Sequence, residues 1–227
     1  MEQNQIYILK TPIPWPELSH LWSDERMSPI KALKAHTPTK KDVFRAYKDC
    51  PFDRVKVVVL GQDPYPFPKV ANGLAFDCSN SNYVQLQPSL DSIYDACERE
   101  NIDFSTRSKS LSHLPSQGVL LLNSALTCIP NRPGSHQELW RFFIEETIDV
   151  INKKDFVVWL LYGNIAKSFK HLINKQHKVF ESVHPVADTY AIDGPPRFYT
   201  WFNETNKELM KRSHDPIMWF EPSELPF

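Results

Sequence analysis

The chain has 227 residues and a formal net charge of −1, with 41% hydrophobic and 23% charged residues. This length suits one well-buried core and is short for two full domains, so we expect a single domain over residues 1–227. The near-neutral charge excludes a polybasic binder that holds nucleic acid by phosphate neutralisation alone. No apolar stretch approaches the about 20 residues that a membrane-spanning helix needs.

The N-terminus and the cysteines indicate the compartment. Met1–Gln5 is polar and acidic, unlike a secretory signal, so we expect a cytoplasmic protein, with a nuclear or viral-host compartment left open. The four cysteines form no close pair and no cluster with histidine at metal-ligand spacing. We therefore expect reduced, mostly buried thiols and no metal, with an iron–sulfur cluster as the less favoured alternative.

The first predicted unit is an N-terminal helical cover over residues 1–50. This segment contains several prolines and two helix-like stretches, and Trp15 and Trp22 are spaced to anchor it on a larger body.

Apolar runs of strand length follow the cover. Such runs are typical of strands buried on both faces, as in parallel sheets. The predicted strands are Val55–Leu60, Val119–Leu122, Phe156–Leu161 and Val179–Val183.

Helical patterns separate these strands. Pro88 stands at a favourable first-turn position, and Ser135 with Glu138 makes a capping box before a long amphipathic segment. Asn164 is expected to cap a helix that runs through 170–173, and residues 203–212 form another. The tail 216–227 is proline-rich and is expected to wrap the surface.

Strands that alternate with helices predict an α/β fold. We expect three layers, α/β/α, around a central, mostly parallel four-stranded sheet.

Polar residues follow the predicted strands at their carboxyl ends, where ligands bind in open α/β sheets. Asp63 lies just past the first strand, Asn123 past the second and His184 past the fourth. Pro64 has a fixed φ and pushes Asp63 away from helical geometry, so the acid is held stiffly beside Tyr65. Taken singly, each residue is also typical of a turn or of a buried interior position. Their joint placement indicates a site.

Two common enzyme classes do not fit this sequence. An acid with a histidine suggests a hydrolase triad, but no Gly-x-Ser-x-Gly motif is present. The glycines do not form a phosphate-binding loop either, which excludes nucleoside triphosphate chemistry of that type.

Several motifs together resemble those of the uracil-DNA glycosylase family, and the resemblance covers the chain from about Val55 to Trp219. The motifs occur in the family's order, which makes the match far more specific than any one of them. They are Gly61-Gln62-Asp63-Pro64-Tyr65, Gly73-Leu74-Ala75-Phe76, Pro88-Ser89-Leu90, Gln117–Asn123 and His184-Pro185.

The resemblance implies an enzyme of base excision repair that flips uracil out of DNA and hydrolyses its N-glycosidic bond, leaving an abasic site, without a cofactor. Asp63 then positions the attacking water and stabilises the cationic sugar, while His184 donates a hydrogen bond to uracil O2. The Asn123 amide then pairs with the O4 and N3–H edge of uracil, and the same amide would mispair with the N3 and amino group of cytosine.

The resemblance also assigns the walls of the pocket and the DNA contacts. Phe76 is the ring on which the flipped base stacks, and Tyr65 packs against C5, where a thymine methyl would clash. Gln62 lines the same pocket. The DNA-contacting positions are Pro88, Ser89, Pro185, Thr189 and Tyr190. The implied partners are uracil-containing DNA, single- or double-stranded, and a DNA-mimicking inhibitor protein; a monomer is expected.

Two positions depart from the family pattern. Pro66 stands where relatives have a histidine, which stiffens the loop and removes an imidazole. Asp188 stands at the leucine that serves as a wedge in the duplex, so either Tyr190 wedges instead or single-stranded sites are preferred. These departures leave open a second function, a glycosylase-fold DNA-binding or replication accessory protein with weak excision activity.

Overall fold

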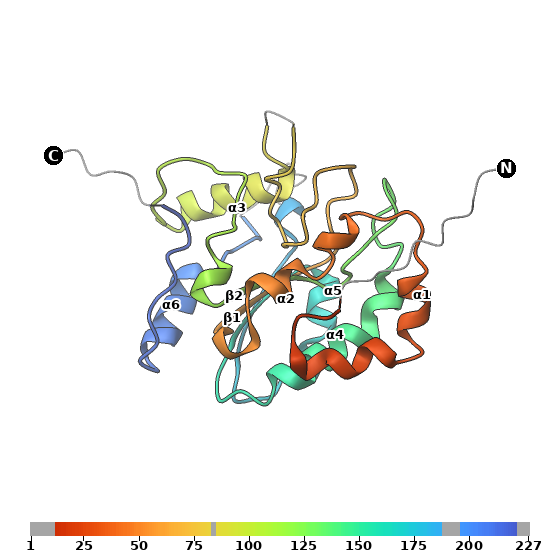
Figure 1. The fold of residues 1–227 in the computed structure, drawn as a ribbon. Helices are drawn as coiled ribbons and strands as arrows, with labels where there is room; N and C mark the ends of the chain where they lie inside the picture. Colours follow the sequence, from red (N-terminus) through yellow and green to blue (C-terminus); the bar gives the residue numbers. More distant parts are fainter. Residues whose placement is uncertain (1–11, 83–84, 188–195, 222–227) are drawn as a thin grey trace.

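The computed structural model describes residues 12–82, 85–187 and 196–221 (Figure 1). Its sheet is entirely parallel, in the order β2-β1-β3-β4, which confirms the predicted α/β fold. In Figure 1, α6 lies to the left of the strands, α4 and α5 lie to the right, and α3 crosses above them. The strands are β1 (Val57–Gly61), β2 (Val119–Asn123), β3 (Val158–Tyr162) and β4 (Lys178–Ser182).

Three of the four strands are buried along their whole length, as the apolar runs predicted. The prediction was wrong for β4, whose first four residues are half-buried. Among the described residues this strand lies at the edge of the sheet and pairs only with β3, so less of the protein covers it. β2 lies at the other edge, but helix α2 (Arg45–Asp49) and the 3-10 turn 115–117 pack on it and bury it.

Helices precede, connect and follow the strands. The longer ones are α3 (Pro88–Arg99), α4 (Gln137–Ile151) and α6 (Phe202–Met210), and the short ones besides α2 are α1 (Met27–Lys31) and α5 (Asn164–Ser168). Helices α3, α4 and α5 connect the strands, α1 and α2 come before β1, and α6 comes after β4. The 3-10 turns cover 16–23, 40–42, 52–54, 115–117, 170–172 and 185–187.

Two predicted helix starts are wrong in detail. Ser135 does not cap α4; its Oγ accepts a hydrogen bond from the Ile129 N–H at 2.8 Å, and His136 is the residue before the helix. Asn164 is the first helical residue of α5 and not its cap, because Gly163 precedes it with φ +92°. This helix ends at Ser168, and a separate 3-10 turn follows at 170–172.

The described part of the N-terminal cover is packed on the domain, as its tryptophans predicted. Trp15 is 1% exposed, and its indole N–H donates to the carbonyls of Tyr47 and Cys50 at 2.9 and 3.0 Å. Trp22 is half-buried, with its ring edge toward Phe44 at 6.4 Å between centroids. The indole of Trp15 therefore joins the first described residues of the cover to its C-terminal end near Tyr47 and Cys50.

The start of the tail is not the surface wrap that its prolines suggested. Ile217, Trp219 and Phe220 are buried, and the Trp219 ring stacks on Phe202 of α6 with centroids 3.8 Å apart. These three side chains therefore belong to the core, whereas Pro216, Met218 and Glu221 between and beside them are exposed, and 222–227 lie outside the described residues.

The four cysteines are free and buried, as predicted. Within the described ranges, no group of three or more His, Cys, Asp or Glu side chains is arranged to hold a metal ion. No helix in the same ranges is long and apolar enough to cross a membrane.

Candidate active site

A cavity of about 380 Å³ opens at the carboxyl ends of β1 and β2. It brings together most of the residues that the sequence singled out, from segments far apart in the chain. Its lining residues are Gln62, Asp63, Pro64, Tyr65, Pro66, Phe67, Leu74, Phe76, Gln87, Pro88, Ser89, Asn123, Pro133, His184 and Val186.

Gly61 is the point where two walls of this cavity meet. It pairs with Asn123 across the β1–β2 ladder. A Cβ at this position would lie 2.8 Å from Asn123 Oδ1 and 3.0 Å from the Phe76 ring. Only glycine allows the amide and the aromatic ring to approach the strand end this closely.

Phe76 and Tyr65 form the aromatic walls. Phe76 has φ +65°, an uncommon conformation for a residue with a side chain, and its ring is 8% exposed. The Tyr65 hydroxyl donates to the Phe76 carbonyl at 3.2 Å, which helps to hold this backbone. Burial raises the pKa of Tyr65 well above its usual range, so the phenol stays a neutral donor. Strained backbone of this kind gathers at functional sites.

Asp63 is the one carboxylate among the described residues that line the cavity, and three N–H groups hold it. Its Oδ2 accepts from Gln62 Nε2 at 3.0 Å and from the Gly134 backbone at 2.9 Å, while Oδ1 accepts from Gln137 Nε2 at 2.8 Å. Burial raises the pKa of Asp63 above its usual value, and these hydrogen bonds oppose that rise because they favour the ionised form. The result is an oriented carboxylate in a partly dry setting.

Gln137 and Gly134 are site residues that the sequence reasoning did not find. Gln137 opens α4, and its amide also donates to the Gln62 carbonyl at 3.0 Å and accepts from the buried Ser124 hydroxyl at 3.1 Å. The long helix is thereby tied to the ends of both β1 and β2. A glutamine at a helix start belongs to no recognisable motif. Its contact with Asp63, 74 residues earlier in the chain, could therefore not be predicted from the sequence.

His184 follows β4, and Asn123 ends β2 at the opposite edge of the sheet. Both residues line the cavity. The His184 ring centroid lies 6.3 Å from that of Phe76. Burial lowers the pKa of His184, so the imidazole is neutral near pH 7. Its Nδ1 is buried and has no hydrogen-bond partner among the described residues. A Cβ on Gly163 would lie 3.3 Å from His184 Cβ, so the glycine before α5 leaves the ring its space.

Asn123 is 7% exposed, and no hydrogen bond joins its side-chain amide to another described residue. The residue lines the cavity, where the donor and the acceptor of the amide are open to a ligand or to water. This side chain is therefore placed to bind the polar edge of a ligand.

The predicted DNA-contacting residues are only partly described. Pro88 is exposed at the first turn of α3, whereas Ser89 lies buried in the cavity wall at 8% exposure, and Pro185 is buried at the start of a 3-10 turn. Thr189 and Tyr190 lie outside the described residues, as does Asp188.

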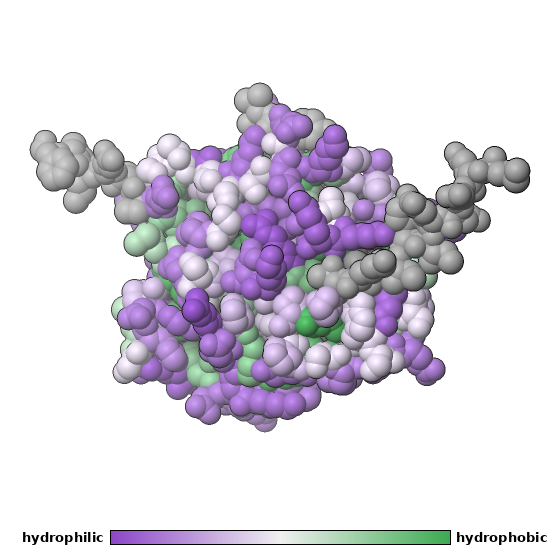
Figure 2. Space-filling view, viewed as in Figure 1, coloured by the Kyte–Doolittle hydropathy of each residue, from purple (hydrophilic) through white to green (hydrophobic). Residues whose placement is uncertain are grey.

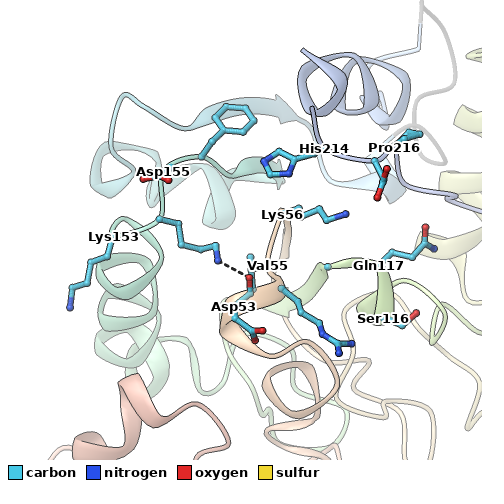
Figure 3. Close-up of a pocket in the computed structure, with 14 residues that line it drawn as sticks. Asp53, Val55, Lys56, Ser116, Gln117, Lys153, Asp155, His214 and Pro216 are labelled. Carbon is cyan, nitrogen blue, oxygen red and sulfur yellow. Dashed lines mark hydrogen bonds between the residues drawn. The ribbon is translucent and has the colours of Figure 1, made fainter. Parts of the chain in front are cut away.

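A second, larger pocket of about 770 Å³ lies at the opposite, amino ends of the strands (Figure 3). Side chains of both charges line it, among them Asp53, Lys56, Asp155 and His214. Lys154 in its wall is already engaged, because its Nζ donates to the carbonyls of Phe52 and Asp53 at 3.0 and 3.1 Å. Ligands of open α/β sheets bind at the carboxyl ends, so the smaller cavity is the candidate active site.

Aromatic walls, an amide, a neutral imidazole and a fixed carboxylate give this α/β protein a cavity whose chemistry suits a flat heterocycle with a hydrogen-bonding edge.

Comparison with known proteins gives the family. Residues 47–209 match the family model of the Uracil DNA glycosylase superfamily. The chain is 37% identical over 185 residues to a uracil-DNA glycosylase of Amoebophilus asiaticus, covering 80% of this chain and 82% of the relative. It is 39% identical to one of Borrelia hermsii, with 79% and 80% covered. The chain belongs to the uracil-DNA glycosylase superfamily.

Solved structures share the fold. The crystal structure of mimivirus uracil-DNA glycosylase superposes with a TM-score of 0.80 at 23% identity, covering 93% of this chain and 90% of that one. A variant of the mimivirus enzyme in complex with UGI gives 0.79 at 22% identity, with 93% and 92% covered.

Proposed function

We propose that this protein is an active uracil-DNA glycosylase that hydrolyses the N-glycosidic bond of deoxyuridine in DNA and leaves an abasic site for base excision repair. The observation that carries the proposal is the carboxylate of Asp63, held by three donors in the same cavity as the Asn123 amide and the His184 imidazole. No other pocket of the described chain combines these groups.

Asp63 acts on the sugar. As the bond between C1′ and N1 breaks, its electron pair leaves with the base and positive charge grows on the deoxyribose. The carboxylate stabilises this charge and orients the water that adds to C1′. Gln137 and Gly134 support the role because their hydrogen bonds orient the carboxylate and favour its ionised form.

His184 acts on the leaving base. Negative charge grows on uracil O2 as the bond breaks, and a hydrogen bond that strengthens with this charge lowers the barrier. A neutral imidazole is a suitable donor, and the burial that lowers the pKa of His184 supports this form. Its Nε2 carries the hydrogen in this assignment, with Nδ1 as the buried, unprotonated nitrogen.

Asn123, Tyr65 and Phe76 select the base. The Asn123 amide pairs with O4 and N3–H of uracil, whereas the N3 and amino group of cytosine present the opposite pattern. The Phe76 ring supplies the stacking surface, and Tyr65, fixed on the Phe76 carbonyl, fills the space that a thymine methyl needs. Gln62 contributes through its carbonyl network with Ser124 and Gln137.

DNA reaches this cavity over its rim. Pro88 and Pro185 are proposed to border the path of the strand, and Ser89 to add main-chain N–H groups at the start of α3. Thr189 and Tyr190 remain proposed contacts from the sequence. Since a mimivirus relative is bound to UGI, a DNA-mimicking inhibitor is proposed to occupy the same rim here. We further propose a monomer acting in the cytoplasm, or in a nucleus or viral-host compartment.

Uracil excision from synthetic oligonucleotides tests the function. The protein is incubated with single- and double-stranded DNA that carries one uracil, and abasic sites are detected by alkaline cleavage, with Asp63→Asn as the inactive control. We expect excision that Asp63→Asn abolishes. DNA binding without excision from either substrate would instead identify the accessory protein that Pro66 and Asp188 left open.

A further inference from the structure

Phe67 is the one phenylalanine in the described chain that is classed as exposed. Its exposure is 45%, whereas the other described phenylalanines are buried or half-buried. Single exposed apolar residues are common on proteins, so exposure alone carries little weight. The position of this ring is what distinguishes it.

Phe67 lines the mouth of the candidate active site. Val186 and His184 lie on the same cavity, at the end of the β4 segment. The other exposed large hydrophobic side chains are not among the residues that line it: Tyr199, Met210 and Met218. The face of the molecule seen in Figure 2 is mainly hydrophilic, with hydrophobic residues showing only between polar ones.

The loop that presents Phe67 is rigid. Pro64, Pro66 and Pro68 fix three φ angles around it. The Pro66 carbonyl accepts from the Asn131 N–H at 2.9 Å, and the Phe67 carbonyl accepts from Val70 at 3.3 Å. An exposed ring on a stiff loop loses little conformational entropy when it binds, so it is suited to contact a partner.

We propose that Phe67 stacks on a base next to the extruded uracil and so keeps the DNA strand open at the cavity mouth. This rests on the proposed function and adds a residue to it. When a nucleotide leaves the stack, its neighbours expose their faces, and an apolar or aromatic side chain that covers them compensates for the lost stacking. The family resemblance places an acid, Asp188, at the position of the apolar wedge, and Phe67 supplies an apolar ring from another loop.

Stacking of one base on one aromatic ring predicts the size of the effect. Removal of the ring in Phe67→Ala should raise KM about tenfold to hundredfold on single-stranded DNA and leave kcat within about threefold. Phe67→Trp should retain the affinity, because a larger ring still stacks, whereas Phe67→Leu should lie between. The matched control is Met218→Ala, an exposed side chain at 59% that does not line the cavity.

A second substrate separates stacking from damage to the cavity. An oligonucleotide in which abasic spacers flank the uracil offers no neighbouring base, so Phe67→Ala and the wild-type protein should excise from it equally well. In an Asp63→Asn background, 2-aminopurine beside the uracil reports stacking directly, and its fluorescence should rise on binding only when Phe67 is removed.

Equal KM values for Phe67→Ala and wild type on ordinary DNA would overturn the proposal. So would an equal loss on the flanking-abasic substrate, since the ring would then act on the uracil pocket itself. If the wild-type protein does not excise uracil, the proposed function fails, and the 2-aminopurine signal still tests Phe67 on its own.

Discussion

The hydrogen bond from Gln137 to Asp63 joins the long helix α4 to the proposed catalytic carboxylate. Gln137→Met removes it, together with the bonds of the same amide to the Gln62 carbonyl and the Ser124 hydroxyl. Methionine keeps the length of the side chain and removes its donor and acceptor. The lost contact is the shortest of the three on Asp63, at 2.8 Å. Gln137 itself does not line the cavity, so substrate contacts are retained.

The structure sets the size of the effect. A hydrogen bond to a charged group contributes about 1.5–3 kcal/mol, and about 1.4 kcal/mol is a factor of ten in rate. If that energy orients the carboxylate in the transition state, kcat falls about 10- to 100-fold and KM stays within about twofold. Burial raises the pKa of Asp63 above its usual value, and the hydrogen bond from Gln137 opposes this rise. Loss of the bond should therefore raise the pKa of Asp63 further. The acidic limb of the rate profile then moves to higher pH.

Initial rates of uracil release between pH 4 and 9 give both quantities. Gln137→Glu should be slower still at neutral pH, because it sets a second carboxylate against Asp63. Gln176→Met is the control, since Gln176 donates to the Asn152 carbonyl at 3.0 Å on an exposed turn far along the chain. A Gln137→Met variant with wild-type kcat and an unshifted profile would refute the reasoning.

Other substitutions test the packing around the site. Gly61→Ala should lower excision about 100-fold, because its Cβ would displace the amide that lies 2.8 Å away; full activity with an unchanged melting temperature would contradict the close approach. Trp219→Ala should lower the free energy of unfolding in urea by about 3–5 kcal/mol, because Trp219 is 4% exposed and stacks on Phe202. A decrease below about 1 kcal/mol would contradict a core position for this residue. Burial lowers the pKa of His177, so the unfolded chain binds the proton first and stability should fall as pH drops below about 6.5. His177→Asn, which keeps an acceptor for the Val157 N–H, should flatten that part of the stability profile, and an unchanged slope would exclude His177 as its source.

Much of the fold was predictable because buried parallel strands have an apolar signature of their own. The runs around Val58, Leu121 and Leu160 predicted the three fully buried strands, and the proline before Ser89 marked the start of α3. Ser135 was misjudged since its hydroxyl bonds the Ile129 N–H, a loop contact that no helix rule anticipates.

The site was predictable where residues stand at strand ends. Asp63, Asn123 and His184 share one cavity because the carboxyl ends of parallel strands meet at one edge. Gln137 was not predictable, since its contact with Asp63 depends on how α4 packs against the sheet. The left-handed backbone of Phe76 likewise has no sequence signal, because phenylalanine rarely adopts it.

Because β4 is a half-buried edge strand, we expect excision activity to depend on local unfolding of this strand. Segments with few buried contacts open at a lower free energy than the global unfolding transition. β4 pairs on one side only, and His184 follows two residues after its end. Mild urea should therefore detach the imidazole from the cavity while β1, β2 and β3 still protect their amides from hydrogen exchange. Excision activity should therefore be lost at a lower urea concentration than the global fold. The protein would stop acting in DNA repair well before it unfolded enough to be degraded by proteases.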